Sequence, residues 1–197
     1  MSAAAPTTAP STTPPAPISR TVRLIRVAVL LVAGLAIAFS ATQHENLSFD
    51  IGLTTAALGA LGIAHIIEWV AAPAAYRTVV PLLLGLVAIL SGLALPFTTS
   101  VLVFAFVVAG WALISAILEF LGATVRPGSR PDATLVGAAG VLLALFVLLV
   151  REDQVAVLGF FGAYALLVGI FLGISAFDTR RVTDTAGDQA GSTPAAR

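Results

Sequence analysis

Hydrophobic residues gather into six long runs along the chain, separated by short polar segments. The runs cover roughly residues 22–41, 51–72, 78–96, 100–122, 133–150 and 154–177. Each is close to the length of about 20 residues that an α-helix needs to cross about 30 Å of hydrocarbon. Helix is the expected state, because an open sheet edge in lipid leaves backbone groups without hydrogen-bond partners. The pattern therefore predicts six membrane-spanning helices.

A glycine interval of 25 residues occurs three times within this pattern. The pairs are Gly34 and Gly59, Gly85 and Gly110, and Gly137 and Gly162. Successive pairs are 51 and then 52 residues apart, and the segments GALGIAHIIEW and GWALISAILEF match each other. A recurring interval predicts an internal repeat. We therefore expect an all-α, polytopic membrane protein, its six transmembrane helices forming three hairpin repeats of about 51 residues, at about 22–72, 77–123 and 132–178.

These six glycines are predicted to be helix-packing sites. Gly85 lies about ten residues before the end of its run and Gly110 about ten residues after the start of the next, or about 15 Å from the surface in each case. Both therefore lie near mid-membrane on antiparallel neighbours. No hydrophobic force joins helices in lipid, so close approach at small residues supplies the packing.

Both ends of the chain differ from this central part. Residues 1–20 are rich in Pro, Ala and Thr and are predicted to be a disordered tail. Residues 21–178 form the predicted transmembrane domain, and residues 179–197 form a polar cytoplasmic tail. An alternative takes Arg20, Arg23, Arg26 and the run to Ala41 as a signal peptide.

Composition and charge place the protein in the membrane class. Hydrophobic residues make up 58% of the chain and charged residues 10%, against about 25% charged in soluble domains. The lipid bilayer is thus the expected partner. The net charge is zero, which argues against nucleic acid as a partner because that calls for a basic surface. The absence of Cys excludes disulfides and thiolate metal sites.

The arginines predict the orientation. The segments ATQHENLSFD, PFTTS and REDQ alternate with the others and hold one arginine, Arg151. The nine arginines of the opposite side are Arg20, Arg23, Arg26, Arg77, Arg126, Arg130, Arg180, Arg181 and Arg197. Since positive charge marks the cytoplasmic side, both termini are expected to be cytoplasmic.

Four charged residues recur with the repeat. Arg26 and Arg77 precede their glycines by eight residues, and Glu68 and Glu119 follow theirs by nine. All four lie about 12–14 Å from the midplane. We predict interfacial ion pairs Arg26/Glu68 and Arg77/Glu119 that clamp each hairpin, with Arg77/Glu68 as an alternative. A second interpretation is that Glu68 and Glu119 bind a cation or carry a proton.

Histidine adds two further candidates. His65 precedes Glu68 by three residues, so the two share a helix face and His65 is either a packing residue or a proton-responsive partner. At the opposite side, a small acidic surface is expected to be a solvated loop cluster, with a response to external acid as the alternative. Its members are His44, Glu45, Asp50, Glu152 and Asp153.

No catalytic set emerges from the chain. There is no HExxH, no GxSxG, no phosphate-binding glycine loop and no metal-ligand cluster in the sequence, so we expect no enzyme, no cofactor and no metal. Ser91 and Ser115 are the most polar residues of the helix centres, and each hydroxyl is expected to bond its own helix backbone. Trp111 and Tyr164 occupy equivalent positions as packing bulk.

GLVAILSGLALPF followed by GWALISAILEFLGA resembles the HdeD-like family of short-repeat bacterial membrane proteins. GAAGVLLALFVLLV with GFFGAYALLVGIFLGISAF is similar to a further copy, and the resemblance covers roughly residues 23–181. It implies a multi-pass protein of the bacterial cytoplasmic membrane associated with acid resistance and stress response. It carries over no catalytic residues.

Two functions are therefore expected. The first is a non-enzymatic membrane protein of the stress response that acts through membrane packing or through partners, either as a homo-oligomer or with another membrane protein. The alternative is a conduit or carrier for a small solute or a proton that uses Glu68, His65 and Glu119 near the cytoplasmic side.

Overall fold

The computed structural model describes residues 20–74, 77–125 and 130–177. The predicted C-terminal tail, Arg126 and all of the predicted N-terminal tail except Arg20 lie outside these residues. Within the described ranges the regular elements are all helical, so the predicted all-α class is confirmed. The elements are α1 (Arg20–Phe39), η1 (Ala41–Gln43), α2 (Leu47–Ala71), α3 (Val80–Ala94), η3 (Leu95–Phe97), α4 (Val101–Val125), α5 (Arg130–Leu149) and α6 (Gln154–Phe177).

The six α-helices are each long and apolar enough to cross a membrane, with α3 and η3 together forming the third span. Local signals set their ends. Asn46 caps α2 by accepting a hydrogen bond from the Ser48 amide at 3.1 Å, which starts the helix four residues before the predicted run. Pro81 lies in the first turn of α3, where its missing N–H costs little. Pro96 falls in η3, which ends the third span.

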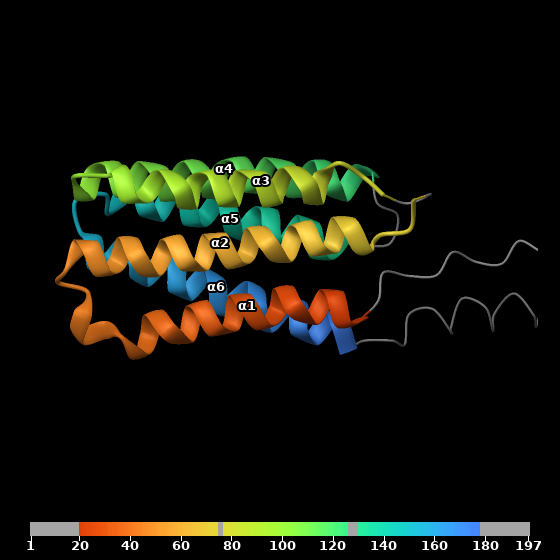
Figure 1. The fold of residues 1–197 in the computed structure, drawn as a ribbon, viewed down its shortest axis with the longest axis horizontal. Helices are drawn as coiled ribbons and strands as arrows, with labels where there is room; N and C mark the ends of the chain where they lie inside the picture. The colour runs from red at the N-terminus through yellow and green to blue at the C-terminus, as the bar shows by residue number, and fades with distance from the viewer. Residues whose placement is uncertain (1–19, 75–76, 126–129, 178–197) are drawn as a thin grey trace, which may run out of the picture.

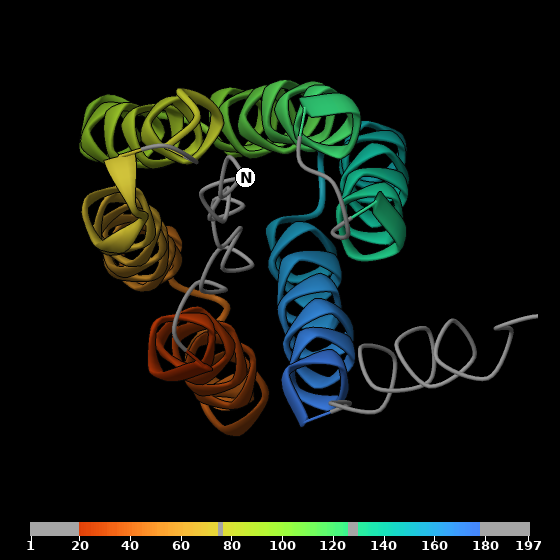
Figure 2. The same cartoon turned by 90° about the vertical axis from the view of Figure 1, so that its right-hand side faces the viewer.

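Successive α-helices run in alternating directions along the bundle (Figure 1). Each α-helix contacts the next along the chain, and α6 contacts α1, so the six close into a ring. Figure 2 shows the ring from its end, with α1 and α6 next to each other. Helix α1 packs most extensively on α6, α2 on α3, and α4 on α5. The α1–α2, α3–α4 and α5–α6 interfaces are smaller. The largest interfaces therefore join different predicted hairpins rather than the two helices of one hairpin.

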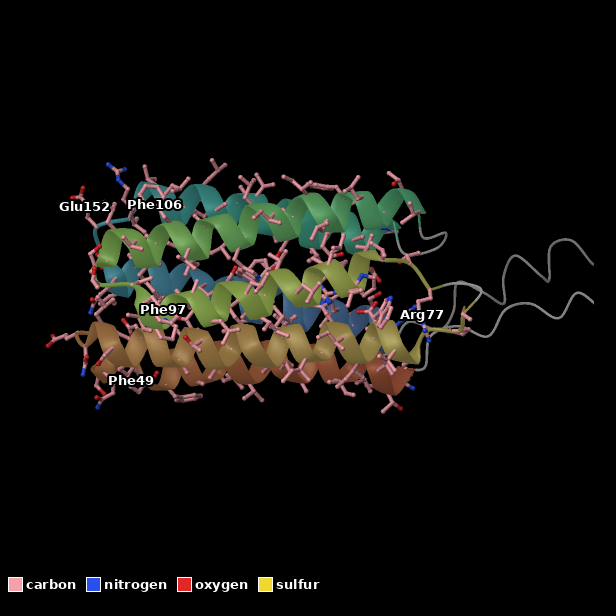
Figure 3. All side chains as sticks on the ribbon, turned by 45° about the horizontal axis from the view of Figure 1, so that its top comes forward. Phe49, Arg77, Phe97, Phe106 and Glu152 are labelled. Atoms are coloured by element: carbon pink, nitrogen blue, oxygen red, sulfur yellow. The ribbon has the colours of Figure 1, made fainter. Side chains whose placement is uncertain are left out.

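The two ends of the ring carry different charges. Arg20 lies over the Phe177 ring at 4.0 Å, so both ends of the described chain meet at one end of the bundle, here called the terminal end. The opposite end is called the far end. Figure 3 shows Arg77 at the terminal end and Glu152 at the far end, with apolar side chains along the outer faces. Large apolar side chains such as Phe106 are exposed there, as expected for lipid contact.

The far half of the interior is filled by an apolar plug. Its side chains have no exposed surface and belong to one hydrophobic cluster. The plug consists of Leu58, Leu95, Phe104, Val147, Val157 and Leu158. Because these residues come from α2, η3, α4, α5 and α6, the plug joins most of the ring at its far half.

Four of the six predicted packing glycines lie at helix contacts. A Cβ on Gly34 would lie 3.0 Å from the Gly162 carbonyl oxygen, and one on Gly162 would lie 2.9 Å from Ile37 Cγ2. A Cβ on Gly137 would meet the Phe120 ring at 3.0 Å. These contacts join α1 to α6 and α4 to α5, so the close approaches occur at the large interfaces.

The prediction was wrong for the other two glycines. A Cβ on Gly59 or Gly110 would meet nothing within 4 Å. On α2 the close contact occurs one turn later, where a Cβ on Gly85 would lie 2.9 Å from the Gly62 carbonyl oxygen. The space beside the Cα of Gly59 and of Gly110 is therefore open in the direction of a side chain, although the Gly59 backbone nitrogen lies 3.6 Å from a Cβ built on Gly92 of α3.

Candidate functional site

The terminal half of the interior holds an ion pair between α1 and α4. The Arg26 guanidinium Nη2 lies 2.5 Å from Glu119 Oε1, and their side chains are 15% and 8% exposed. The two residues belong to different predicted hairpins, so this ion pair differs from the predicted pair of Arg26 with Glu68. Both helices carry their charge at the same depth, as the sequence indicated, but Arg26 reaches across the ring to its partner.

Arg77 has a different role from the one predicted. Its Nη2 donates hydrogen bonds to the carbonyl oxygens of Val70 at 3.1 Å and Ala72 at 3.2 Å. Its guanidinium also lies over the Trp69 ring at 5.1 Å. The predicted Arg77/Glu119 pair is therefore wrong, because Arg77 caps the C-terminus of α2, where a positive charge is favourable.

His65 and Glu68 lie on one face of α2, beside the Arg26–Glu119 pair. His65 Nδ1 is 3.8 Å from Glu68 Oε2. Glu68 and Glu119 both add coulombic attraction to the charge of Arg26. The structure thus brings together four of the five predicted charged or titratable residues, and it places Arg77 at the helix end.

Arg26, His65 and Glu119 line a small cavity to which all six helices contribute side chains. One lining residue from each helix, in chain order, is Arg26, His65, Leu84, Glu119, Val136 and Tyr164. The cavity holds about 10 Å³, close to the space for one water molecule. We call this cavity and its polar lining the polar centre.

Trp111 and Ser115 complete the polar centre from α4. The Trp111 ring packs edge-on against Phe161 at 5.5 Å and against Tyr164 at 5.9 Å, so its predicted role as packing bulk is confirmed. The hydrogen bonding of Ser115 differs from the prediction. Its hydroxyl is buried and, among the described residues, has no hydrogen-bond partner, so it does not bond its own helix backbone.

A second buried pair lies at the far end, between η1 and α2. His44 Nδ1 is 2.6 Å from Asp50 Oδ1, and His44 Nε2 is 2.9 Å from the Ile37 carbonyl oxygen. A carbonyl only accepts, so Nε2 carries a hydrogen, and one further proton lies between His44 and Asp50. Gln154 donates to the His44 carbonyl oxygen at 2.7 Å and so ties this loop to α6.

The prediction of a solvated loop cluster is therefore wrong for two of its five residues. Asp50 has no exposed surface and His44 is 4% exposed, whereas Glu45, Glu152 and Asp153 are exposed. Asp50 is buried because the Asn46 cap starts α2 early and turns Asp50 inward. The sequence signal was present in the Asn46–Ser48 capping pattern, which the loop interpretation overlooked.

Among the described residues, no group of three His, Asp or Glu side chains is placed to hold a metal ion. No family model, curated protein or solved structure matches the chain. The class of protein therefore comes from the fold itself. Six apolar helices with apolar outer faces make this an integral, multi-pass membrane protein in contact with the lipid bilayer.

Proposed function

We propose that this protein is a non-enzymatic component of the bacterial cytoplasmic membrane that acts in the acid-stress response through membrane packing or through a protein partner, with both termini cytoplasmic. The glycine spacing and its resemblance to HdeD-like proteins support the stress role. The arginine bias supports the orientation, since Arg20, Arg23 and Arg26 lie in the first turns of α1 at the terminal end.

The observation that carries the proposal is the apolar plug. An ion that left the polar centre toward the far end would pass between side chains such as Phe104 and Leu158, which have no exposed surface. The side chains of the plug themselves offer no polar partner, and a charge in an apolar membrane interior costs about 3 kcal/mol or more. We therefore expect the bundle to block the passage of ions.

Reconstitution into proteoliposomes tests this closure. Vesicles that contain the protein are placed across a pH gradient and, separately, across a potassium gradient, with empty vesicles as the control. We expect both gradients to decay at the rate of the empty vesicles. Faster decay of either gradient would contradict the closed bundle.

Acid survival tests the stress role. Cells of the source bacterium that lack the protein are challenged with acid, with and without the parent chain restored. We expect survival to fall without the protein and to recover with it. Equal survival of all strains would overturn the stress role and leave the closed bundle untouched.

One observation favours the alternative, a proton or small-solute conduit. The polar centre holds His65 and Glu119, and Glu68 lies beside it, 3.8 Å from His65, so the residues that the alternative requires are close together. A conduit predicts that Glu68→Gln changes the proton flux while the fold survives. Glu152→Gln is the matched control, because Glu152 lies on the far loop with an 85% exposed side chain.

A further inference from the structure

The polar centre presents more hydrogen-bond donors than its own acceptors satisfy. Arg26 Nε, Trp111 Nε1 and Ser115 Oγ are buried and, within the described ranges, have no hydrogen-bond partner. All three residues line the same cavity. Trp111 is 2% exposed and Ser115 is 8% exposed, so bulk solvent does not reach them. A buried donor without a partner is unfavourable, so three in one place call for an acceptor.

The donors restrict the chemistry of the occupant. An indole N–H and a guanidinium N–H only donate, so the occupant must accept at least two hydrogen bonds. A metal cation accepts no hydrogen bond, so it would leave both N–H groups without a partner. The hydroxyl of Ser115 can either donate or accept a hydrogen bond, so it fits an occupant that also does both.

The volume of the cavity and the charges around it favour a neutral molecule as the occupant. The cavity of about 10 Å³ is at the lower limit for a single water, which needs two to four polar partners. Chloride is larger than water, and Glu119 already neutralises Arg26 at 2.5 Å. An anion would therefore meet a crowded cavity with no uncompensated positive charge.

We propose that the polar centre is a binding site for one structural water molecule. The water accepts hydrogen bonds from Arg26 Nε and Trp111 Nε1 and exchanges one with Ser115 Oγ. It thereby joins α1 to α4 a second time, beside the Arg26–Glu119 pair. This site does not depend on the proposed function, because a closed bundle and a conduit both hold the water.

Solid-state NMR of the whole protein in lipid bilayers tests the site. The Trp69→Phe variant leaves Trp111 as the one indole of the chain, since the sequence has two Trp residues. With ¹⁵N labelling, magnetisation transfer from water is measured to the Trp111 indole proton and to the Arg26 Nε proton. We expect both protons to receive transfer from a long-lived water. No transfer to either proton would overturn the proposal.

A matched pair of variants identifies where the water lies. Ser115→Val places a methyl group in the cavity and should reduce the transfer to Trp111 several-fold, whereas Ser91→Val changes a serine that does not line the cavity and should leave the transfer unchanged. Unchanged transfer in Ser115→Val would overturn the site. Where Ser115→Val does not fold, a high-resolution structure of the parent decides, because the water must lie about 2.7–3.2 Å from both Arg26 Nε and Trp111 Nε1.

Discussion

At the scale of single residues, the stability of this protein depends on buried polar groups that find partners on other helices. Arg26 bonds Glu119 across the ring, and His44 bonds Asp50 between η1 and α2. Both pairs are nearly removed from solvent, so the loss of one partner leaves the other desolvated and unpaired. Such pairs matter more for the fold than the exposed charges of the loops.

The Arg26–Glu119 pair should behave as a coupled unit. We expect Arg26→Gln or Glu119→Gln alone to lower the free energy of unfolding by about 3–5 kcal/mol, because a buried charge remains unpaired. The double variant should lose clearly less than the sum of the two. The measurement is a double-mutant cycle from denaturant unfolding in detergent micelles. Arg77→Gln with Glu119→Gln is the control, and their effects should add within about 0.5 kcal/mol.

The far-end pair predicts a contrast between two aspartates. Asp50→Asn keeps the shape of the side chain but removes the carboxylate that bonds His44, which should cost about 1–3 kcal/mol. Asp153 accepts a hydrogen bond from the Ala156 amide at 3.0 Å as a helix cap, and Asn caps a helix equally well. Asp153→Asn should therefore leave thermal stability in detergent almost unchanged. Equal losses in both variants would contradict the buried role of Asp50.

At the scale of the helices, the sequence predicted the depth of each residue in the membrane, but it did not predict the direction in which each helix face points. The hydrophobic runs gave all six spans, and counting residues placed Arg26 and Glu119 at one level. Hydropathy carries no information on which way a lipid-embedded helix faces, because lipid and protein neighbours are both apolar. This is why Gly62, and not Gly59, meets Gly85, and why Arg26 found a partner outside its own predicted hairpin. The repeat of about 51 residues itself stays a prediction.

The glycine contacts make a sharp test of this difference. A Cβ on Gly85 would meet the Gly62 carbonyl oxygen at 2.9 Å, so Gly85→Ala should push α2 and α3 apart and cost about 1–3 kcal/mol. Gly110→Ala adds its Cβ in open space and should be neutral or stabilise by up to about 1 kcal/mol, because alanine favours the helix. Thermal unfolding in detergent measures both. A loss in Gly110→Ala equal to that in Gly85→Ala would contradict the observed faces.

At the scale of the whole molecule, an even number of spans brings both ends of the described chain to one end of the ring, and the arginine bias predicts that this end is cytoplasmic. The chain has no Cys, so single cysteines report the orientation directly. Thr99→Cys at the far end should react with a membrane-impermeant maleimide in intact cells. Thr124→Cys at the terminal end should react only after the membrane is opened. The reverse pattern would invert the assigned orientation.

The contact between α1 and α6 has a consequence for the order of assembly. A ribosome delivers α1 first and α6 last, yet these two form one of the largest interfaces of the ring. The contacts of Gly34 with Gly162 and Leu166 therefore form last, because α6 is made after all the other spans. Until then, this face of α1 is exposed to lipid. A nascent chain that stops at Leu149 holds five spans and lacks every contact that α6 makes, so the α1–α6 interface can form only after the last span has been made.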